Sequence, residues 1–396
     1  MNKVVGYPII VLLLLLSFEL FSYFFLSLDN RAIRARVYWP PVASEAQFQS
    51  YIDRRDPLLG WPTKDSMHAN TDSDGARQSP ANEALAGQSV CVSVYGDSFT
   101  YSGEVNDENA WANVLAALLQ CPVKNYGVNG YGVDQSVLRF RNNRRDDADL
   151  TILGFYVHDM NRNMNQWRYL LTGAHMFTFK PSFSIPEDDI LQLHTIPVNS
   201  YETLMQTFES PESVLPTEYY LPGCRSLRCQ VRPSLPYSWS LIMLAKRIVQ
   251  EIDVNRVSLA TPMREWNYPA WYDTKYGAFQ EKIDLNTAII RYFLQTCNEK
   301  LRRCIVLVIP DTDSLRFFQE NGVSQLGQVL TPVREYAETW DATGFFTQNT
   351  KNKGLCYYVG MNRDCRGHYN KEGYALLADF VAQKIWDQGL KKTMGN

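Results

Sequence analysis

The stretch VCVSVYGDSFTYSGEV, residues 90–105, decides the fold of this chain. Its first six residues form an apolar run with β-branched side chains, as in a strand that is buried on both faces of a sheet. The run leads directly into Gly96, Asp97 and Ser98, and a helix is expected to follow. Because such strands belong to parallel sheets covered by helices, the stretch predicts an α/β fold.

Strand-like and helical segments alternate from residue 90 onward. Strands are predicted at 90–95, 122–128, 148–157 and 304–311, and helices at 108–120, 133–145, 284–301 and 370–390. The alternation predicts a three-layer α/β/α flavodoxin-like sandwich with a parallel sheet. It breaks at about 165–280, which is rich in aromatic residues and contains one predicted helix, at 237–252. We interpret this segment as an inserted cap region, in which the large aromatic side chains form core more often than a sugar-stacking surface.

An almost wholly apolar segment occupies residues 7–28. A helix of that length reaches roughly 33 Å, enough to cross a bilayer, and no small-x-small cleavage site follows it. The segment predicts an uncleaved transmembrane signal anchor in the inner membrane. Residues 1–6 would then be cytoplasmic, 29–87 an irregular lead-in, and 88–390 the globular domain that contains the insertion.

A single charged residue, Glu19, interrupts the apolar segment near its middle. A carboxylate there costs about 2–3 kcal/mol. We favour snorkelling or transient protonation as the explanation. The alternative is a contact between Glu19 and another membrane helix.

Two features give opposite predictions for the side of the membrane on which the globular domain lies. Arg31, Arg34 and Arg36 follow the apolar segment, and by themselves they favour a cytoplasmic domain. The eight cysteines favour an oxidising compartment, because they are even in number and fall into four neighbouring couples: Cys91 and Cys121, Cys224 and Cys229, Cys297 and Cys304, Cys356 and Cys365. Large domains can be exported despite flanking charge, so we predict a periplasmic domain.

Composition narrows the classes of function. The net charge of −3 leaves no basic surface for nucleic acid, so no nucleic-acid partner is predicted. The five histidines have no paired acidic cluster and no cysteine couple has the CxxC spacing, so neither a metal site nor another cofactor is predicted.

Ser98 is the candidate nucleophile. It follows a predicted strand, and ligands of parallel α/β sheets bind beyond the carboxyl ends of the strands. A serine hydroxyl needs a general base, and His368 is the best placed, in a loop just before the last helix. Asp364 is close enough in sequence to orient the His368 imidazole, as the acid of a serine triad does.

Oxyanion donors are predicted after the next two strands. Glycines in NYGVNGYG, residues 125–132, allow backbone N–H groups to approach a ligand, and GFYVHDMNRN, residues 154–163, brings polar side chains to the same edge. Four polar elements at successive strand ends in this order resemble the blocks of the GDSL/SGNH hydrolases. The resemblance covers about 88–160 and 303–388, and it implies Ser98 as nucleophile, the amides of Ser98 and Gly130 as oxyanion donors, and His368 as base.

The chain departs from the family pattern at two positions. The third block reads His158–Asp159 where the family has Asn–Asp, so either the His158 imidazole donates to the oxyanion, which we favour, or Asn161 reaches in. Cys365 stands where the family has the triad aspartate, so the acid is Asp364 or the site is a Ser–His dyad oriented by a backbone carbonyl. Asp97, Asp159 and Asn161 are secondary site candidates.

These features predict a serine ester hydrolase that works through an acyl-enzyme. The family and the predicted location imply ester-bearing envelope carbohydrate or lipid as substrate. Two alternatives stay open: an O-acyltransferase that modifies an extracytoplasmic polysaccharide with the same residues, and a non-catalytic envelope-assembly protein on the same fold.

Overall fold

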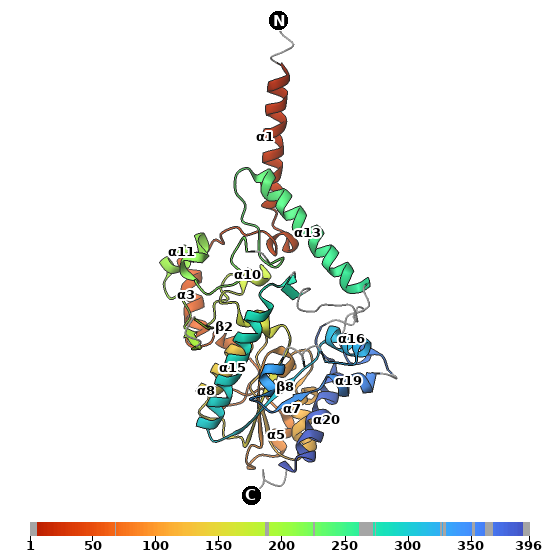
Figure 1. Cartoon of the computed structure of the whole chain (residues 1–396). Helices are drawn as coiled ribbons and strands as arrows, with labels where there is room; N and C mark the ends of the chain where they lie inside the picture. The colour runs from red at the N-terminus through yellow and green to blue at the C-terminus, as the bar shows by residue number, and fades with distance from the viewer. Residues whose placement is uncertain are drawn as a thin grey trace. The chain divides into compact units, whose positions relative to one another are not determined.

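The structure is a computed structural model that describes residues 6–67, 69–186, 190–224, 226–260, 272–273, 275–324, 327, 330–350, 353–360 and 367–390 (Figure 1). The chain forms two compact units, each assembled from segments that are distant in sequence. The first unit comprises residues 1–53, 164–179 and 197–279, and the second comprises 54–163, 180–196 and 280–396. The first unit thus contains most of the segment that we interpreted as an insertion.

A five-stranded parallel sheet forms the centre of the second unit. Its order is β4-β3-β5-β8-β9, with β3 (Val92–Tyr95), β4 (Val123–Asn125), β5 (Leu150–Phe155), β8 (Arg303–Val308) and β9 (Thr339–Asp341). Numbered within the sheet, this is the 2-1-3-4-5 order of flavodoxin-like folds, so the predicted fold class is confirmed. The edge strand β9 was not predicted, because its three residues are too few for a periodic pattern.

Helices cover both faces of the sheet, which completes the three layers (Figure 1). One face packs into a large apolar core with four helices: α7 (Trp111–Leu119), α16 (Thr312–Asn321), α19 (Thr343–Thr350) and α20 (Lys371–Asp387). On the other face, Tyr95 of β3 packs on Phe140 of α8 (Val133–Asn142), and Phe140 packs on Phe293 of α15 (Phe279–Glu299). Every residue of β3 and β5 is buried, as both-face coverage requires.

The sheet order places a crevice at the carboxyl end of β3. The chain leaves β3 for β4 on one side and then returns to β5 on the other, so the strand order reverses at β3. Parallel α/β sheets bind ligands at such a reversal. Ser98, the first residue of α6 (Ser98–Tyr101), lies directly beyond this strand end.

The lead-in of residues 29–87, predicted as irregular, contains regular structure. Phe48 and Tyr51 bury one side of a short amphipathic helix, α3, but single turns and two-residue strands leave no sustained period in the sequence. The elements of this segment are α2 (Arg31–Arg34), α3 (Glu45–Arg54), β1 (Arg55–Asp56), β2 (Gly60–Thr63), α4 (Lys64–Met67) and α5 (Pro80–Ala84).

Smaller elements connect the large ones. In the second unit they are a hairpin of β6 (Ser182–Ser184) and β7 (Gln192–His194), the helices α9 (Asp159–Asn163) and α18 (Thr331–Arg334), and the 3-10 turns Asp107–Asn109 and Leu355–Tyr357. In the first unit they are α10 (Tyr169–Thr172), α11 (Tyr201–Glu209) and α12 (Pro211–Val214).

Aromatic side chains form the core of the first unit. The buried ring of Trp167 stacks on Phe179 at 5.2 Å and on Phe208 at 5.6 Å between ring centroids. Beside them the buried Glu218 carboxylate accepts hydrogen bonds from the backbone N–H groups of Gln166, Trp167 and Tyr220, and burial raises the pKa of Glu218. The described aromatic residues of this core therefore pack inward rather than forming a sugar-stacking surface.

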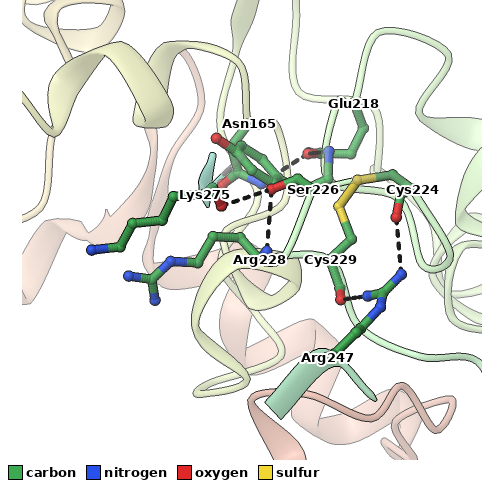
Figure 2. Close-up of a disulfide and its surroundings, with 9 residues drawn as sticks. Asn165, Glu218, Cys224, Ser226, Arg228, Cys229, Arg247 and Lys275 are labelled. Carbon is green, nitrogen blue, oxygen red and sulfur yellow. Dashed lines mark hydrogen bonds between the residues drawn. A yellow bond between two sulfur atoms is a disulfide. The ribbon is translucent and has the colours of Figure 1, made fainter. Parts of the chain in front are cut away.

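Neighbouring cysteines form disulfides, as the even count indicated. The described pairs are Cys91–Cys121, Cys224–Cys229 and Cys297–Cys304, and Cys356 is also disulfide-bonded. Cys365 lies outside the described residues. Figure 2 shows the Cys224–Cys229 loop, whose two cysteine carbonyls accept hydrogen bonds from the Arg247 guanidinium. The two hydrogen bonds from Arg247 connect the loop to the long helix α13 (Tyr237–Ala260).

A buried ion pair braces α8 in the second unit, and it gives a stability prediction. Lys180 Nζ donates to Asp134 Oδ2, and both side chains are buried. We expect Lys180→Met to lower the free energy of unfolding by about 3–5 kcal/mol, because it leaves a carboxylate buried without its partner. The double variant Lys180→Met with Asp134→Leu should recover most of the loss. Chemical denaturation of the full chain measures both variants, and a single variant as stable as the wild type would contradict the assignment.

Candidate active site

The turn that presents Ser98 depends on a glycine and a capping aspartate. A Cβ at Gly96 would overlap the Thr100 side chain, so only glycine fits between β3 and α6. The Asp97 side chain then caps α6 by accepting a hydrogen bond from the Phe99 N–H at 2.9 Å. The sharp turn holds the largely buried Ser98 side chain at the end of the strand.

His368 reaches Ser98 from the far end of the chain. It lies in the loop before α20, and its Nε2 is 2.7 Å from Ser98 Oγ. The imidazole packs on the Phe99 ring at 4.8 Å between centroids, which fixes its plane. The 2.7 Å between His368 Nε2 and Ser98 Oγ is a distance at which an imidazole accepts a serine proton. Proton acceptance at Nε2 requires the tautomer with its proton on Nδ1.

The second imidazole nitrogen faces a carboxylate that sequence reasoning missed. His368 Nδ1 is 3.1 Å from Glu104 Oε1, and Glu104 lies six residues after Ser98 in the same opening stretch. The Glu104 carboxylate, the His368 imidazole and the Ser98 hydroxyl therefore lie in the spatial order of the acid, base and nucleophile of a serine triad. The signal was present as a carboxylate just beyond the nucleophile helix, but its partner is 264 residues away. The predicted acid, Asp364, lies outside the described residues and stays a prediction.

An arginine joins the ends of two strands behind the nucleophile. Arg162 Nη1 is 2.9 Å from both Asp97 Oδ2 and Asp159 Oδ1, and it also donates to the Tyr131 carbonyl at 2.8 Å. Burial and the nearby Asp97 charge raise the pKa of Asp159. Asp97 Oδ2 is 3.4 Å from Ser98 Oγ, at the outer limit of a hydrogen bond. The two aspartates therefore hold the Ser98 turn in place through Arg162, which the sequence had not singled out.

The glycine-rich loop after β4 packs against α6, the helix that begins with Ser98. A Cβ at Gly127 would lie 2.6 Å from the Tyr101 backbone nitrogen, so the loop and α6 are in close contact. Gly130 has a φ of +86° and lies against the Trp61 indole, a combination that favours glycine. The loop thus lies beside the nucleophile helix, and the donor role of the Gly130 amide stays a prediction.

The two candidates for the side-chain oxyanion donor after β5, His158 and Asn161, have different surroundings. His158 packs on the Tyr156 ring and, with His368, lines a cavity of about 290 Å³. Asn161 is buried, and its Oδ1 accepts a hydrogen bond from Lys282 Nζ at 2.9 Å. The cavity lining includes His158 and not Asn161, which favours His158 as the oxyanion donor, and this role stays a prediction.

A second cavity also has His368 in its lining. It measures about 430 Å³, and Glu104, Asn109 and Lys371 are among its lining residues. His368 and Gly367 line both cavities. Within the described ranges, no group of three or more His, Cys, Asp or Glu side chains could hold a metal ion. The chemistry that these side chains support is nucleophilic attack by a serine.

Comparison with known proteins gives distant structural matches. No protein-family model and no curated protein sequence matches the chain. A lipolytic protein of the G-D-S-L family from Desulfitobacterium hafniense matches with 11% identity and a TM-score of 0.31, over 74% of this chain and 99% of its own. A G-D-S-L lipolytic protein from Veillonella parvula matches with 11% identity and a TM-score of 0.33, over 74% and 97%.

The Glu104 contact predicts a graded loss of activity. We expect Glu104→Gln to lower kcat/KM for an ester substrate by about 10-fold, because a hydrogen bond to a charged group contributes about 1.5–3 kcal/mol and partial exposure of Glu104 favours the low end. The paired variant Asp364→Asn should change kcat/KM less. A larger loss in Asp364→Asn would return the acid role to Asp364.

The placement of His158 predicts a separate effect on the oxyanion. We expect His158→Leu to lower kcat by about 100- to 1,000-fold with little change in thermal stability, as for loss of one oxyanion donor. His158→Asn, which restores a donor of the family type, should recover part of the rate. Equal kcat in wild type and His158→Leu would rule out the donor role.

Proposed function

We propose that the chain is a serine ester hydrolase with an acyl-enzyme mechanism. The observation that carries the proposal is the 2.7 Å contact between Ser98 Oγ and His368 Nε2, with His368 Nδ1 facing a carboxylate. The contact joins residues 270 positions apart in the crevice of a parallel sheet, where ligands bind. A non-catalytic assembly protein has no need for such a paired serine and histidine.

In the acylation step, Ser98 Oγ attacks the ester carbonyl carbon and its proton passes to His368 Nε2. The carbonyl oxygen becomes negative, and the amides of Ser98 and Gly130 with the His158 imidazole are the proposed donors to it. The tetrahedral intermediate collapses as the C–O bond to the alcohol breaks. His368 gives its proton to the departing alkoxide, which leaves an acyl ester on Ser98.

Deacylation repeats these steps with water as nucleophile. His368 removes a proton from water, the hydroxide adds to the acyl carbon, and Ser98 Oγ leaves and regains the proton from His368. Glu104, or Asp364 if its loop supplies the acid, stabilises the imidazolium that forms in both steps. The products are a carboxylic acid and a free hydroxyl on the substrate.

The proposed substrate is an acyl ester on envelope carbohydrate or lipid. The support is the location: α1 (Gly6–Leu26) is long and apolar enough to cross a membrane over Tyr7–Leu26, and the described cysteines pair as disulfides. We propose that α1 is a single-pass inner-membrane anchor and that the catalytic unit faces the periplasm, because paired cysteines persist in oxidising compartments.

O-acyl transfer is the second candidate, and the two cavities beside His368 favour it. A sugar hydroxyl could approach the acyl-enzyme from one cavity while the ester donor occupies the other. The covalent half-reaction is the same, and the acceptor hydroxyl takes the place of water. Adding a glycan acceptor to the reaction and analysing the products by mass spectrometry distinguishes the two outcomes.

Covalent labelling tests the proposed nucleophile directly. We expect the full chain in detergent to react with a fluorophosphonate probe at Ser98, and Ser98→Ala and His368→Ala to lose the label, since attack needs both the hydroxyl and its base. Ser102→Ala is the matched control, because Ser102 lies in the same stretch and its hydroxyl accepts a hydrogen bond from the Trp111 N–H. Undiminished labelling of Ser98→Ala, or none of folded wild type, would contradict the proposal.

A further inference from the structure

The charged residue of the apolar N-terminal helix has a partner in α13. The Glu19 carboxylate accepts hydrogen bonds from the Ser238 hydroxyl and the Ser238 backbone N–H, at the start of α13. Positive charge at the N-terminal end of a 24-residue helix also favours a carboxylate there. Glu19 therefore contacts another helix of the same chain, and the placement of that helix in the membrane is part of the proposal below.

One face of α1 packs against α13 and the residues around it. Glu19, Ser22 and Leu26 recur at helical spacing, and Ser22 and Leu26 are fully buried, whereas most of the remaining α1 surface is exposed. Tyr23 packs on Tyr237 at 5.1 Å between ring centroids. Figure 1 shows α13 starting beside the second half of α1.

The contact sets the depth of the start of α13. Glu19 precedes Leu26, the end of the apolar span, by seven residues, which corresponds to about 10 Å along a helix. Where α1 crosses the bilayer, Ser238 is therefore about 10 Å inside the apolar layer. The residues next to Ser238 enter that layer with it.

The two faces of α13 differ in what they contact. Tyr237, Leu241, Leu244 and Ile248 form an inner face that packs with Leu26 and the neighbouring core of the first unit. Farther along the same helix, Arg36 pairs with Glu251 at 2.9 Å and Arg247 holds the Cys224–Cys229 loop. These contacts fix the rotation of α13 about its axis.

The opposite face is apolar and exposed where α13 begins. Trp239 is 61% exposed and Ile242 is 51% exposed, and Leu235 in the preceding turn is 76% exposed. Lys246, exposed on the same side, follows about 12 Å beyond Ser238 along the helix. Leu235, Trp239 and Ile242 therefore precede Lys246, whose long side chain can extend toward the headgroups, and the exposed Val249 and Ile252 lie farther along the helix.

We propose that Leu235, Trp239 and Ile242 form a bilayer-docking surface that inserts among the lipid acyl chains beside α1. The occupant is lipid because the surface continues the apolar face of α1 at the same depth, through the Glu19–Ser238 contact. The inference rests on the proposed membrane span of α1. It makes the start of α13 a second membrane-inserted element, and the inner-face contacts transmit that fixed position to the first unit.

Site-specific photocross-linking tests the surface. The full chain, reconstituted in phosphatidylcholine nanodiscs, would carry p-benzoylphenylalanine in place of Trp239 or Ile242. We expect phospholipid adducts at both positions by mass spectrometry. The matched control replaces Leu301, which is 93% exposed and outside the first unit, and it should give no more than a tenth of the lipid adduct. Retained fluorophosphonate labelling, or intact disulfides, would show that each chain is folded.

A probe in place of Leu14 distinguishes the membrane span of α1 from the docking surface of α13. Leu14 is exposed within α1, so lipid adducts there report the proposed span alone. Adducts at Leu14 without adducts at Trp239 and Ile242 would overturn the docking surface and leave the anchor intact. Cross-links from Trp239 to a second copy of the chain would overturn it as well. Absence of adducts at all three positions would overturn the span and the docking surface together.

Discussion

The parallel pairing of β3 with β4 on one side and β5 on the other is the constraint on which the second unit and its candidate site depend. It buries β3 completely and makes its carboxyl end the point where the strand order reverses. Polar groups from three successive strand ends must then share one small volume. The chain meets this demand with Arg162, which joins Asp97 after β3 to Asp159 after β5. One guanidinium contacts both buried carboxylates and compensates part of their negative charge.

The site built on this edge combines rigid and accessible parts. Ser98 is held by a capped turn with a glycine that leaves room for Thr100, whereas His368, which lines both cavities, and Glu104, which lines one, are partly exposed. The raised pKa of Asp159 follows from the same crowding, because burial and the Asp97 charge both disfavour its ionised form.

The first unit is stabilised by different contacts from those of the sheet-containing second unit. Its core is aromatic, its buried Glu218 carboxylate binds the backbone around Trp167, and a disulfide loop and an ion pair hold α13. These contacts explain why a segment without strand–helix alternation still folds compactly. They also explain an acidic residue in an apolar helix, since Glu19 meets the N-terminal end of α13.

Local pattern determined the fold class and part of the site. Buried strands and amphipathic helices alternate along residues 90–157 and 284–390 of the sequence. The end of the predicted strand at 90–95 is enough to indicate Ser98 as the candidate nucleophile. His368 followed because it precedes the last helix at the same sheet edge. Short elements such as α4 and β9 were not predicted, since three or four residues carry no period, and the ten-residue α3 was missed although it buries one side. Tertiary structure alone decided the pairing of Glu104 with His368, the bridge through Arg162 and the contact of Glu19 with Ser238. Each joins groups from separate segments, and a sequence records which side chains exist but not which of them the folded backbone brings within hydrogen-bond distance.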